Sequence, residues 1–281
     1  MRVLRRPSRG FLLGAAIAAG ATAAWSLFEA QWVELRELEL PLDGVSRELD
    51  GFRILHLSDL HLGTLSLAGR ALDRAVVWAA ERPPDLVVVT GDLVRRPGGR
   101  EALDRALVRL PARHGIVAVL GNHDVYDARD PFSRPTDLSD IHEAGAALLR
   151  DGARTFQVKG ARIQVVGVDP ATYKEGSSRP AERADPAADV RILLCHYPEV
   201  VRRLPPGIFH LVLAGHYHGG QICLPTPWGK LRLKDLRGSY WEGLFATRAG
   251  ALHVSRGLGT SLVPFRFLAR PEATVLTLRS N

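Results

Sequence analysis

The stretch DLVVVTGD, residues 85–92, decides the fold class of this sequence. Its apolar part, LVVV, is an unbroken run of residues that favour extended backbone, which is typical of a strand buried on both faces of a parallel sheet. The run ends in Gly91 and Asp92. Two further stretches repeat this pattern of an apolar run with a polar end, FRILHLSDLH at 52–61 and GIVAVLGNHD at 115–124. The sequence therefore predicts several buried, parallel strands.

Helical patterns separate these predicted strands. Residues 67–84 place apolar side chains at helical spacing and end at two prolines, and residues 100–111 and 136–150 have similar patterns. Strands that alternate with helices predict βαβ units. After about Asp151 short apolar runs follow one another with few helices between them, and residues 172–189 have the composition of a loop. Together these patterns predict an α/β protein in which two sheets pack face to face, with helices outside.

Composition limits the class of protein further. The chain has 281 residues, 46% of them hydrophobic, which is enough for a substantial core. Cys195 and Cys223 do not have the number or spacing of a thiolate metal cage or a disulfide framework, so they are interpreted as buried apolar residues. The formal net charge of +7 is compatible with anionic partners. Nucleic acid is not favoured among them, because the arginines are scattered and no long aromatic and basic groove is indicated.

The N-terminus has the pattern of a membrane anchor or a signal peptide. The first nine residues carry four arginines and precede an uncharged apolar run from Phe11 to Phe28. Because no strong cleavage site follows, residues 1–28 are interpreted as a basic tail with an uncleaved anchor, in preference to a cleaved signal. Residues 29–50 are interpreted as a connector or an edge strand, and residues 51–281 as the main domain.

The charges around this run predict its orientation. Positive residues lie before it and glutamates follow it within residues 29–39, which places the N-terminus inside the cell and the main domain on the outer side of the inner or plasma membrane. The alternative is a helix that lies along the inner face of the membrane, which would leave the domain on the cytoplasmic side.

Five predicted strands end in side chains that can bind a metal ion, and in open α/β sheets ligands bind at such strand ends. Two pairs with one residue between them, Asp59 with His61 and His216 with His218, would point to one side of an extended chain. Carboxylate, amide and imidazole ligands suit Mn, Fe or Zn. The set exceeds what one ion with open positions requires, so two divalent ions that share a carboxylate are predicted. The predicted ligands are Asp59, His61, Asp92, Asn122, His196, His216 and His218.

The motifs DLH, GD, GNHD, a single histidine and GHYH occur in that order between residues 59 and 218. In this order they resemble the motifs of the calcineurin-like metallophosphoesterases, and the resemblance covers residues 51–281. It implies a four-layer α/β/β/α sandwich of two mixed β-sheets flanked by helices. It also implies a binuclear metal centre at one edge of the sandwich, where a hydroxide between the two ions attacks a phosphoester.

The resemblance implies a role for each residue of the motifs. His123 faces the substrate phosphate and the leaving group as a catalytic residue, and Asp124 orients its imidazole. Asp92 bridges the two ions. The other ligands divide into two sets, one for each ion: Asp59, His61 and His218 for the first, and Asn122, His196 and His216 for the second.

The segments GHYHGGQICLP and SRGLGTSLVPFRFLARPEATVLTL resemble a membrane-associated branch of the same family. That branch includes phosphodiesterases and an enzyme that cleaves UDP-2,3-diacylglucosamine in lipid A synthesis, so the implied substrate is a phosphodiester or a lipid- or envelope-linked phosphate. The basic stretch WGKLRLKDLRG, residues 228–238, predicts contacts with an anionic headgroup at the membrane surface. The predicted substrate contacts are Lys230, Arg232, Arg256 and Arg266.

Two alternative functions remain open. A UDP-2,3-diacylglucosamine pyrophosphatase would act on a cytoplasmic sugar nucleotide, which conflicts with the predicted orientation of the domain. A non-catalytic metal-binding scaffold would be expected to lack His123 or one of the ligands, and the sequence retains all of them.

Overall fold

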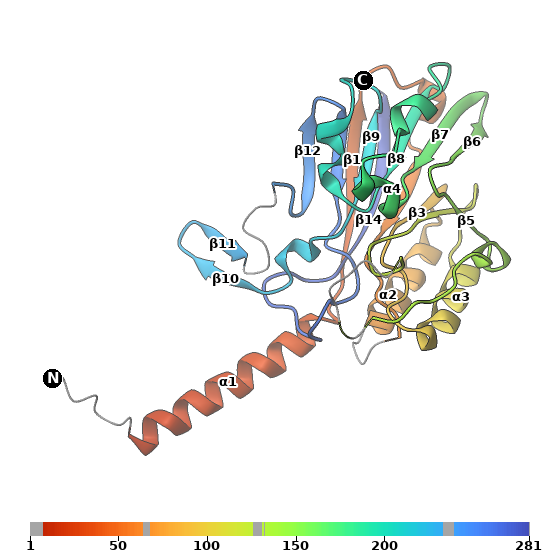
Figure 1. The fold of residues 1–281 in the computed structure, drawn as a ribbon. Helices are drawn as coiled ribbons and strands as arrows, with labels where there is room; N and C mark the ends of the chain where they lie inside the picture. The colour runs from red at the N-terminus through yellow and green to blue at the C-terminus, as the bar shows by residue number, and fades with distance from the viewer. Residues whose placement is uncertain (1–7, 64–67, 126–130, 132, 233–238, 281) are drawn as a thin grey trace.

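The first of two β-sheets carries the strands that the opening motifs predict (Figure 1). The computed structural model describes residues 8–63, 68–125, 131, 133–232 and 239–280. The sheet has six strands in the order β1-β14-β2-β3-β4-β5, and it is mixed because β14 runs antiparallel to β2 while the other pairs are parallel. The strands are β1 (Glu34–Leu42), β2 (Arg53–Leu57), β3 (Leu86–Thr90), β4 (Ile116–Val119), β5 (Ala146–Leu148) and β14 (Glu272–Ser280).

The second sheet also has six strands, in the order β12-β13-β9-β8-β7-β6. Its four central strands are parallel, and an antiparallel strand closes each edge. A separate two-stranded hairpin, β10–β11, projects from the domain (Figure 1). The strands are β6 (Ala153–Val158), β7 (Ala161–Gly167), β8 (Val190–Leu194), β9 (Leu211–Ala214), β10 (Cys223–Thr226), β11 (Gly229–Arg232), β12 (Gly243–Thr247) and β13 (Gly250–Val254).

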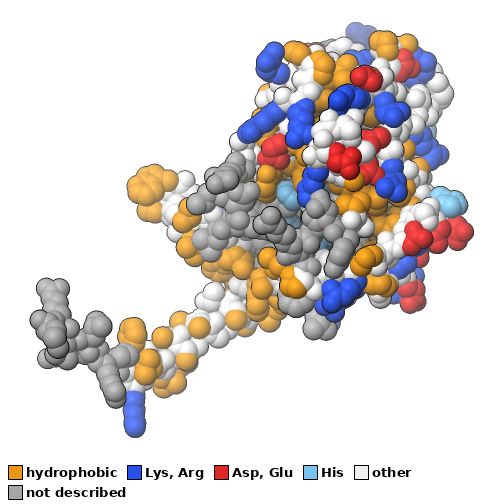
Figure 2. All heavy atoms as spheres, in the orientation of Figure 1, with side chains coloured by type: hydrophobic (Ala, Val, Ile, Leu, Met, Phe, Trp, Pro, Cys, Tyr) orange, Lys and Arg blue, Asp and Glu red, His pale blue; other side chains and the backbone are white. Residues whose placement is uncertain are grey.

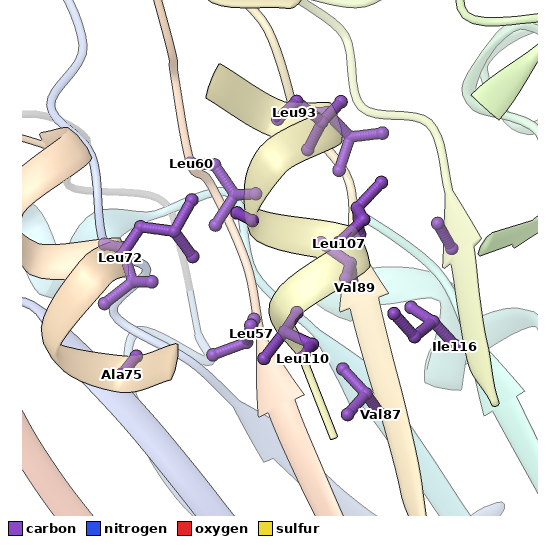
Figure 3. Packing of buried hydrophobic residues seen from close by; sticks show 14 of the residues in the cluster. Leu57, Leu60, Leu72, Ala75, Val87, Val89, Leu93, Leu107, Leu110 and Ile116 are labelled. Atoms are coloured by element: carbon purple, nitrogen blue, oxygen red, sulfur yellow. The ribbon is translucent and has the colours of Figure 1, made fainter. Parts of the chain in front are cut away.

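Alternate residues of β3 face different layers of the molecule. Val87 and Val89 pack with helices α2 (Ala68–Glu81) and α3 (Arg100–Arg109) on the outer face of the first sheet (Figure 3). Val88 packs instead into the core between the two sheets. A third cluster lies on the outer face of the second sheet, under α4 (Pro170–Glu175) and the 3-10 helix η5 (Pro198–Arg203). The predicted four-layer α/β/β/α sandwich is therefore confirmed.

Two local predictions of secondary structure are wrong, one because of strand pairing and the other because of a helix cap. Residues 136–150 were predicted to be helical, but only a 3-10 turn, η3 (Ile141–Ala144), forms before Gly145 turns the chain with a φ of 88°. The following residues form β5, because their backbone pairs with the exposed edge of β4. Within the predicted loop 172–189, the first residues belong to α4, which Asp169 caps by accepting a hydrogen bond from the N–H of Ala171.

The apolar N-terminal run forms one long helix, α1 (Arg9–Glu29), which extends away from the domain (Figure 1). By length and composition it could cross a membrane. Its last turn contacts the domain: the carbonyl of Ser26 accepts a hydrogen bond from the N–H of Arg266, and the carboxylate of Glu29 accepts one from the N–H of Ala269. Residues 1–7 and 233–238, which carry part of the predicted basic tail and basic stretch, lie outside the described residues.

The packing of α3 on the first sheet gives a test of the core. Leu107 is buried against the sheet, whereas its neighbour Val108 is 72% exposed. We expect Leu107→Ala to lower the free energy of unfolding by about 2–5 kcal/mol, because it removes buried methyl groups and leaves a cavity. Val108→Ala should change it by less than about 0.5 kcal/mol. Thermal unfolding of the full chain in detergent measures both, and equal shifts for the two variants would contradict this packing.

Candidate metal centre

The loops that follow β2, β3, β4, β8 and β9 meet at one edge of the sandwich, between the carboxyl ends of the two sheets. These loops bring all seven predicted ligands together. Six of the seven side chains are buried, and His216 is partly exposed. The structure thus places side chains from positions 59 to 218 of the sequence in one site.

The first group of donors surrounds His61. Its Nε2 atom lies 3.2 Å from Nε2 of His218 and 3.4 Å from Oδ2 of Asp92. Nε2 of His218 lies 3.4 Å from Oδ1 of Asp59. One donor atom from each of these four residues lies within 4.8 Å of all the others, which is compact enough to hold one cation.

The second group of donors surrounds His196. Its Nε2 atom lies 3.0 Å from Oδ1 of Asn122, 3.1 Å from Nδ1 of His216 and 3.3 Å from Oδ2 of Asp92. The same oxygen atom of Asp92 therefore lies at the edge of both groups. Its other oxygen, Oδ1, accepts a hydrogen bond of 2.8 Å from the N–H of His123, which fixes the carboxylate.

The chemistry of these atoms fits divalent cations. Two imidazole nitrogens that face each other at 3.1–3.2 Å direct their lone pairs together unless a proton or a cation lies between them. Burial opposes charge on His196, but the carboxylates of Asp92 and Asp59 raise its pKa to about 9. Burial would raise the pKa of Asp92, but the surrounding histidines hold it well below its usual value. The site thus attracts positive charge, and metal ions would compete there with protons.

The backbone at the ligands is left-handed. The φ angles of Asp59, His61, Asp92, His216 and His218 lie between 46° and 79°. The prediction that the two spaced pairs point to one side of an extended chain was therefore wrong: the loops turn at each of these ligands and aim the side chains inward. Left-handed backbone is unfavourable for residues other than glycine, and such strain clusters at functional sites.

Glycines let the loops approach one another closely. A Cβ atom at Gly215 would lie 2.0 Å from Oγ of Ser58 and 2.3 Å from Oδ2 of Asp59. A Cβ atom at Gly121 would lie 2.2 Å from Oδ1 of Asp92. Both distances are shorter than van der Waals contact, so these positions require glycine if the two carboxylates are to stay in place.

Residues 52–220 match the family model described as calcineurin-like phosphoesterase. The chain belongs to this family. It is 30% identical to the metallophosphoesterase YkuE of Bacillus subtilis, over 97% of this chain and 95% of that protein. It is 30% identical to the phosphodiesterase YaeI of Escherichia coli, over 81% and 82% of the two chains. It is 27% identical to the UDP-2,3-diacylglucosamine pyrophosphatase LpxG of Chlamydia muridarum, over 93% and 94%.

His123 of this phosphoesterase lies beside the two ligand groups. Its ring packs edge-on against His61 with centroids 4.7 Å apart, and its Nε2 atom lies 4.0 Å from Oδ2 of Asp92. Its Nδ1 atom lies 2.7 Å from Oγ of Ser133. The prediction that Asp124 orients this imidazole was wrong, because Asp124 accepts hydrogen bonds from backbone N–H groups instead. These donors are Leu93, Val94 and Gly121.

Asp124 therefore ties the loop after β4 to the loop after β3 and supports the site through the backbone. Burial, together with the nearby charge of Asp92, raises its pKa to about 7.

Two of the four predicted substrate contacts of the phosphoesterase have another role. The guanidinium of Arg266 is fully buried and donates hydrogen bonds to the carbonyls of Arg256, Gly259 and Ala269, and its Nη2 atom lies 3.3 Å from Nδ1 of His218. The predicted phosphate contact of Arg266 is therefore wrong, since burial and these carbonyls occupy its donors.

Arg256 is also withdrawn from solvent. It is 7% exposed and forms ion pairs with the carboxylates of Glu272 and Glu34. These pairs neutralise the charge that was predicted to bind phosphate.

Lys230 and Arg232 lie on β11 and share the carboxylate of Glu242, at 3.7 and 3.0 Å. Their substrate contacts stay predictions.

Sequence reasoning missed several supporting groups. Ser133 follows no recognisable motif, and the carbonyl of Thr90, which lies 2.9 Å from Nδ1 of His196, belongs to the backbone. Behind the centre, His56 and His253 face each other with Nδ1 atoms 2.9 Å apart. Burial lowers the pKa of both histidines, to about 4 in His253, so both are neutral in this core.

Gly215 gives a direct test of the site. Gly215→Ala should displace the carboxylate of Asp59 and lower the affinity for divalent metal by about 10–100-fold, as loss of a supporting contact usually does. Gly98→Ala is the matched control, because its Cβ atom meets open space and its φ is not positive. Metal titration of the full chain in detergent compares the two. Equal affinities would show that Gly215 is not packed against the ligands as described.

Proposed function

We propose that this metallophosphoesterase is anchored in the membrane by α1 and uses two divalent ions, Mn, Fe or Zn, to hydrolyse a phosphodiester or a lipid-linked phosphate. The observation that carries the two-ion centre is the position of Asp92 Oδ2, which lies 3.4 Å from a nitrogen of the first ligand group and 3.3 Å from a nitrogen of the second. A carboxylate in that position can serve both groups.

The residues of the site would have separate roles in such a reaction. When bound, the two ions would lower the pKa of a water molecule and neutralise charge on the phosphate oxygens. Asp59, His61 and His218 would hold one ion, Asn122, His196 and His216 the other, and Asp92 both. The strained loops keep these donors in place before any ligand arrives, so little reorganisation accompanies binding.

His123 is the residue placed to move a proton. Its Nδ1 atom is engaged by Ser133, so its Nε2 atom is the one that faces the ligand groups. An imidazole in this position can stabilise the negative oxygens of the phosphate and protonate the departing alkoxide. A positioned general acid of this kind contributes about 10²–10⁴-fold to a rate.

We expect His123→Ala to lower kcat/KM for a chromogenic phosphodiester by about 10²–10⁴-fold, because the proton donor is lost. Its content of bound metal should remain that of the wild type, since His123 is not one of the seven predicted ligands and all seven are unchanged. His142→Ala, at an exposed histidine, is the control and should have wild-type activity. Removal of metal with a chelator should abolish turnover, and Mn²⁺ should restore it.

A wild-type protein that binds metal but cleaves no phosphoester would contradict the proposal and favour the non-catalytic scaffold. Metal analysis of the purified full chain adds a second measure. A stoichiometry of one ion per chain at saturation would contradict the shared carboxylate.

The membrane anchor is supported by the helix and its flanking charges. The side chains of α1 are almost all exposed, and the helix is apolar along its length. Arginines precede it, which favours a catalytic domain on the extracytoplasmic side. A phosphoesterase held in this way would meet lipid- or envelope-linked phosphates.

A second candidate is a UDP-2,3-diacylglucosamine pyrophosphatase. The likeness to LpxG extends over nearly the whole of both chains and favours it. Its cytoplasmic substrate requires the opposite side of the membrane, so topology separates the two candidates.

Val108 is an exposed position on α3. If the domain is extracytoplasmic, we expect the thiol of the Val108→Cys variant to react with a membrane-impermeant maleimide in intact spheroplasts. The native Cys195 and Cys223 are buried and should react little, as the unmodified chain will show. Labelling only after lysis would place the domain in the cytoplasm and support the pyrophosphatase, which a direct assay with UDP-2,3-diacylglucosamine then tests.

A further inference from the structure

The β10–β11 hairpin presents apolar side chains to solvent. Trp228, in the turn between the strands, is 93% exposed. Leu224 and Leu231 are cross-strand partners, so they lie on one face of the hairpin, and they are 45% and 46% exposed. Large apolar side chains that are grouped and exposed on a projecting element indicate a binding partner, because water solvates them poorly.

The hairpin begins next to the end of α1. The N–H of Cys223, at the start of β10, donates to the carbonyl of Phe267. The same segment, residues 266–269, makes the two hydrogen bonds to Ser26 and Glu29 in the last turn of α1. The hairpin and the helix therefore leave the domain from one shared segment, and Figure 1 shows both projecting on the same side.

Further apolar side chains extend this surface. Gln221 binds the carbonyls of Ser261 and Val263 through its amide, which holds their loop beside the hairpin. In that loop Leu262 is 48% and Val263 is 40% exposed. Figure 2 shows hydrophobic side chains on the hairpin and along α1. We call the side chains of this surface, apart from α1, the apolar rim: Leu224, Trp228, Leu231, Leu262 and Val263.

Aromatic side chains mark the level at which α1 meets the domain. Trp25 and Phe28 lie in the last turns of the helix, and Trp32 follows it, with ring centroids 5.6–6.2 Å apart. Trp25 and Phe28 are 45% and 48% exposed. Tryptophan concentrates at the headgroup level of membranes, where its ring meets lipid and its N–H meets water. This cluster therefore fits the interface of a bilayer that α1 enters.

The polar residues of the hairpin also fit a bilayer. Lys230 and Arg232 both pair with the carboxylate of Glu242, so positive charge is in local excess among the described residues near the apolar rim. Lysine and arginine at this level attract anionic headgroups. Pro225 lies in β10 and Pro227 follows it, and proline, which lacks an N–H, disfavours the addition of a further strand from another protein.

We propose that the apolar rim docks on the surface of a phospholipid bilayer beside α1, with Trp228 inserted at the level of the headgroups. The candidate metal centre would then lie close to the membrane surface, since His218 is separated from β10 by only four residues and touches Arg266 of the shared segment. The consequence for catalysis, which rests on the proposed function, is that the substrate is an amphiphilic phosphate that reaches the site from the bilayer.

The position of Trp228 relative to lipid can be measured directly. The full chain with Trp228→Cys, labelled with an environment-sensitive fluorophore, is reconstituted into vesicles of phosphatidylglycerol and phosphatidylethanolamine. We expect blue-shifted emission that brominated lipids quench. The control is Val108→Cys on α3, where the same fluorophore should have the emission that is typical of an aqueous environment. Emission at Trp228→Cys equal to the control would overturn the proposal. So would a blue shift that brominated lipids do not quench, because that result indicates a contact between protein chains.

A kinetic experiment tests the consequence for catalysis. The double variant Trp228→Ser, Leu231→Ser should raise KM for a phosphodiester lipid in these vesicles by about tenfold or more, given the apolar area that it removes from the membrane. Its kcat/KM for a water-soluble phosphodiester should stay that of the wild type, which also shows that the variant is folded. An unchanged KM for the vesicle substrate would contradict delivery from the bilayer. If the wild type cleaves neither ester, the proposed function fails, while the fluorescence result for docking stands independently.

Discussion

The site depends on one electrostatic constraint: the charge of Asp92 has to be matched where water is excluded. This side chain is 2% exposed, and a buried carboxylate without partners would destabilise the fold by several kcal/mol. One of its oxygens accepts a hydrogen bond from the backbone N–H of His123, and the other faces the imidazoles of His61 and His196. These contacts come from three separate strand ends, so the folding of both sheets is required to satisfy one carboxylate.

The same requirement explains the unusual backbone at the centre. Five of the predicted ligands adopt left-handed φ angles, each of which is unfavourable by about 1–3 kcal/mol for a residue with a side chain. The fold tolerates them because the strands that precede them, β2, β3 and β9, are buried between apolar layers. The rigid sheets stabilise loops that would not hold these conformations alone. The strain lowers the stability of the fold but keeps the donor atoms in fixed positions.

The sequence predicted the buried parallel strands and the clustering of polar side chains at the strand ends, because both depend on local order along the chain. Val87 and Val89 identify a buried strand, and Asp92 follows it directly. Long-range contacts were not predictable. Ser133 contacts His123 from a loop without a motif, and nothing in the sequence around Arg266 indicates that its side chain is buried and cannot bind phosphate. The helical pattern of residues 136–150 did not show that Ala146–Leu148 form a strand instead, because that strand depends on pairing with β4, which is distant in the sequence.

Arg266 connects the N-terminal helix α1 to the candidate metal centre. Its main-chain N–H is bonded to Ser26 in the last turn of α1, and its side chain touches His218. The last turn of α1 is thus connected through Arg266 to the loop that carries His218. A fragment that begins after Glu29 would lose two acceptors, the carbonyl of Ser26 and the carboxylate of Glu29, so the segment that holds Arg266 beside His218 would be less firmly fixed in it.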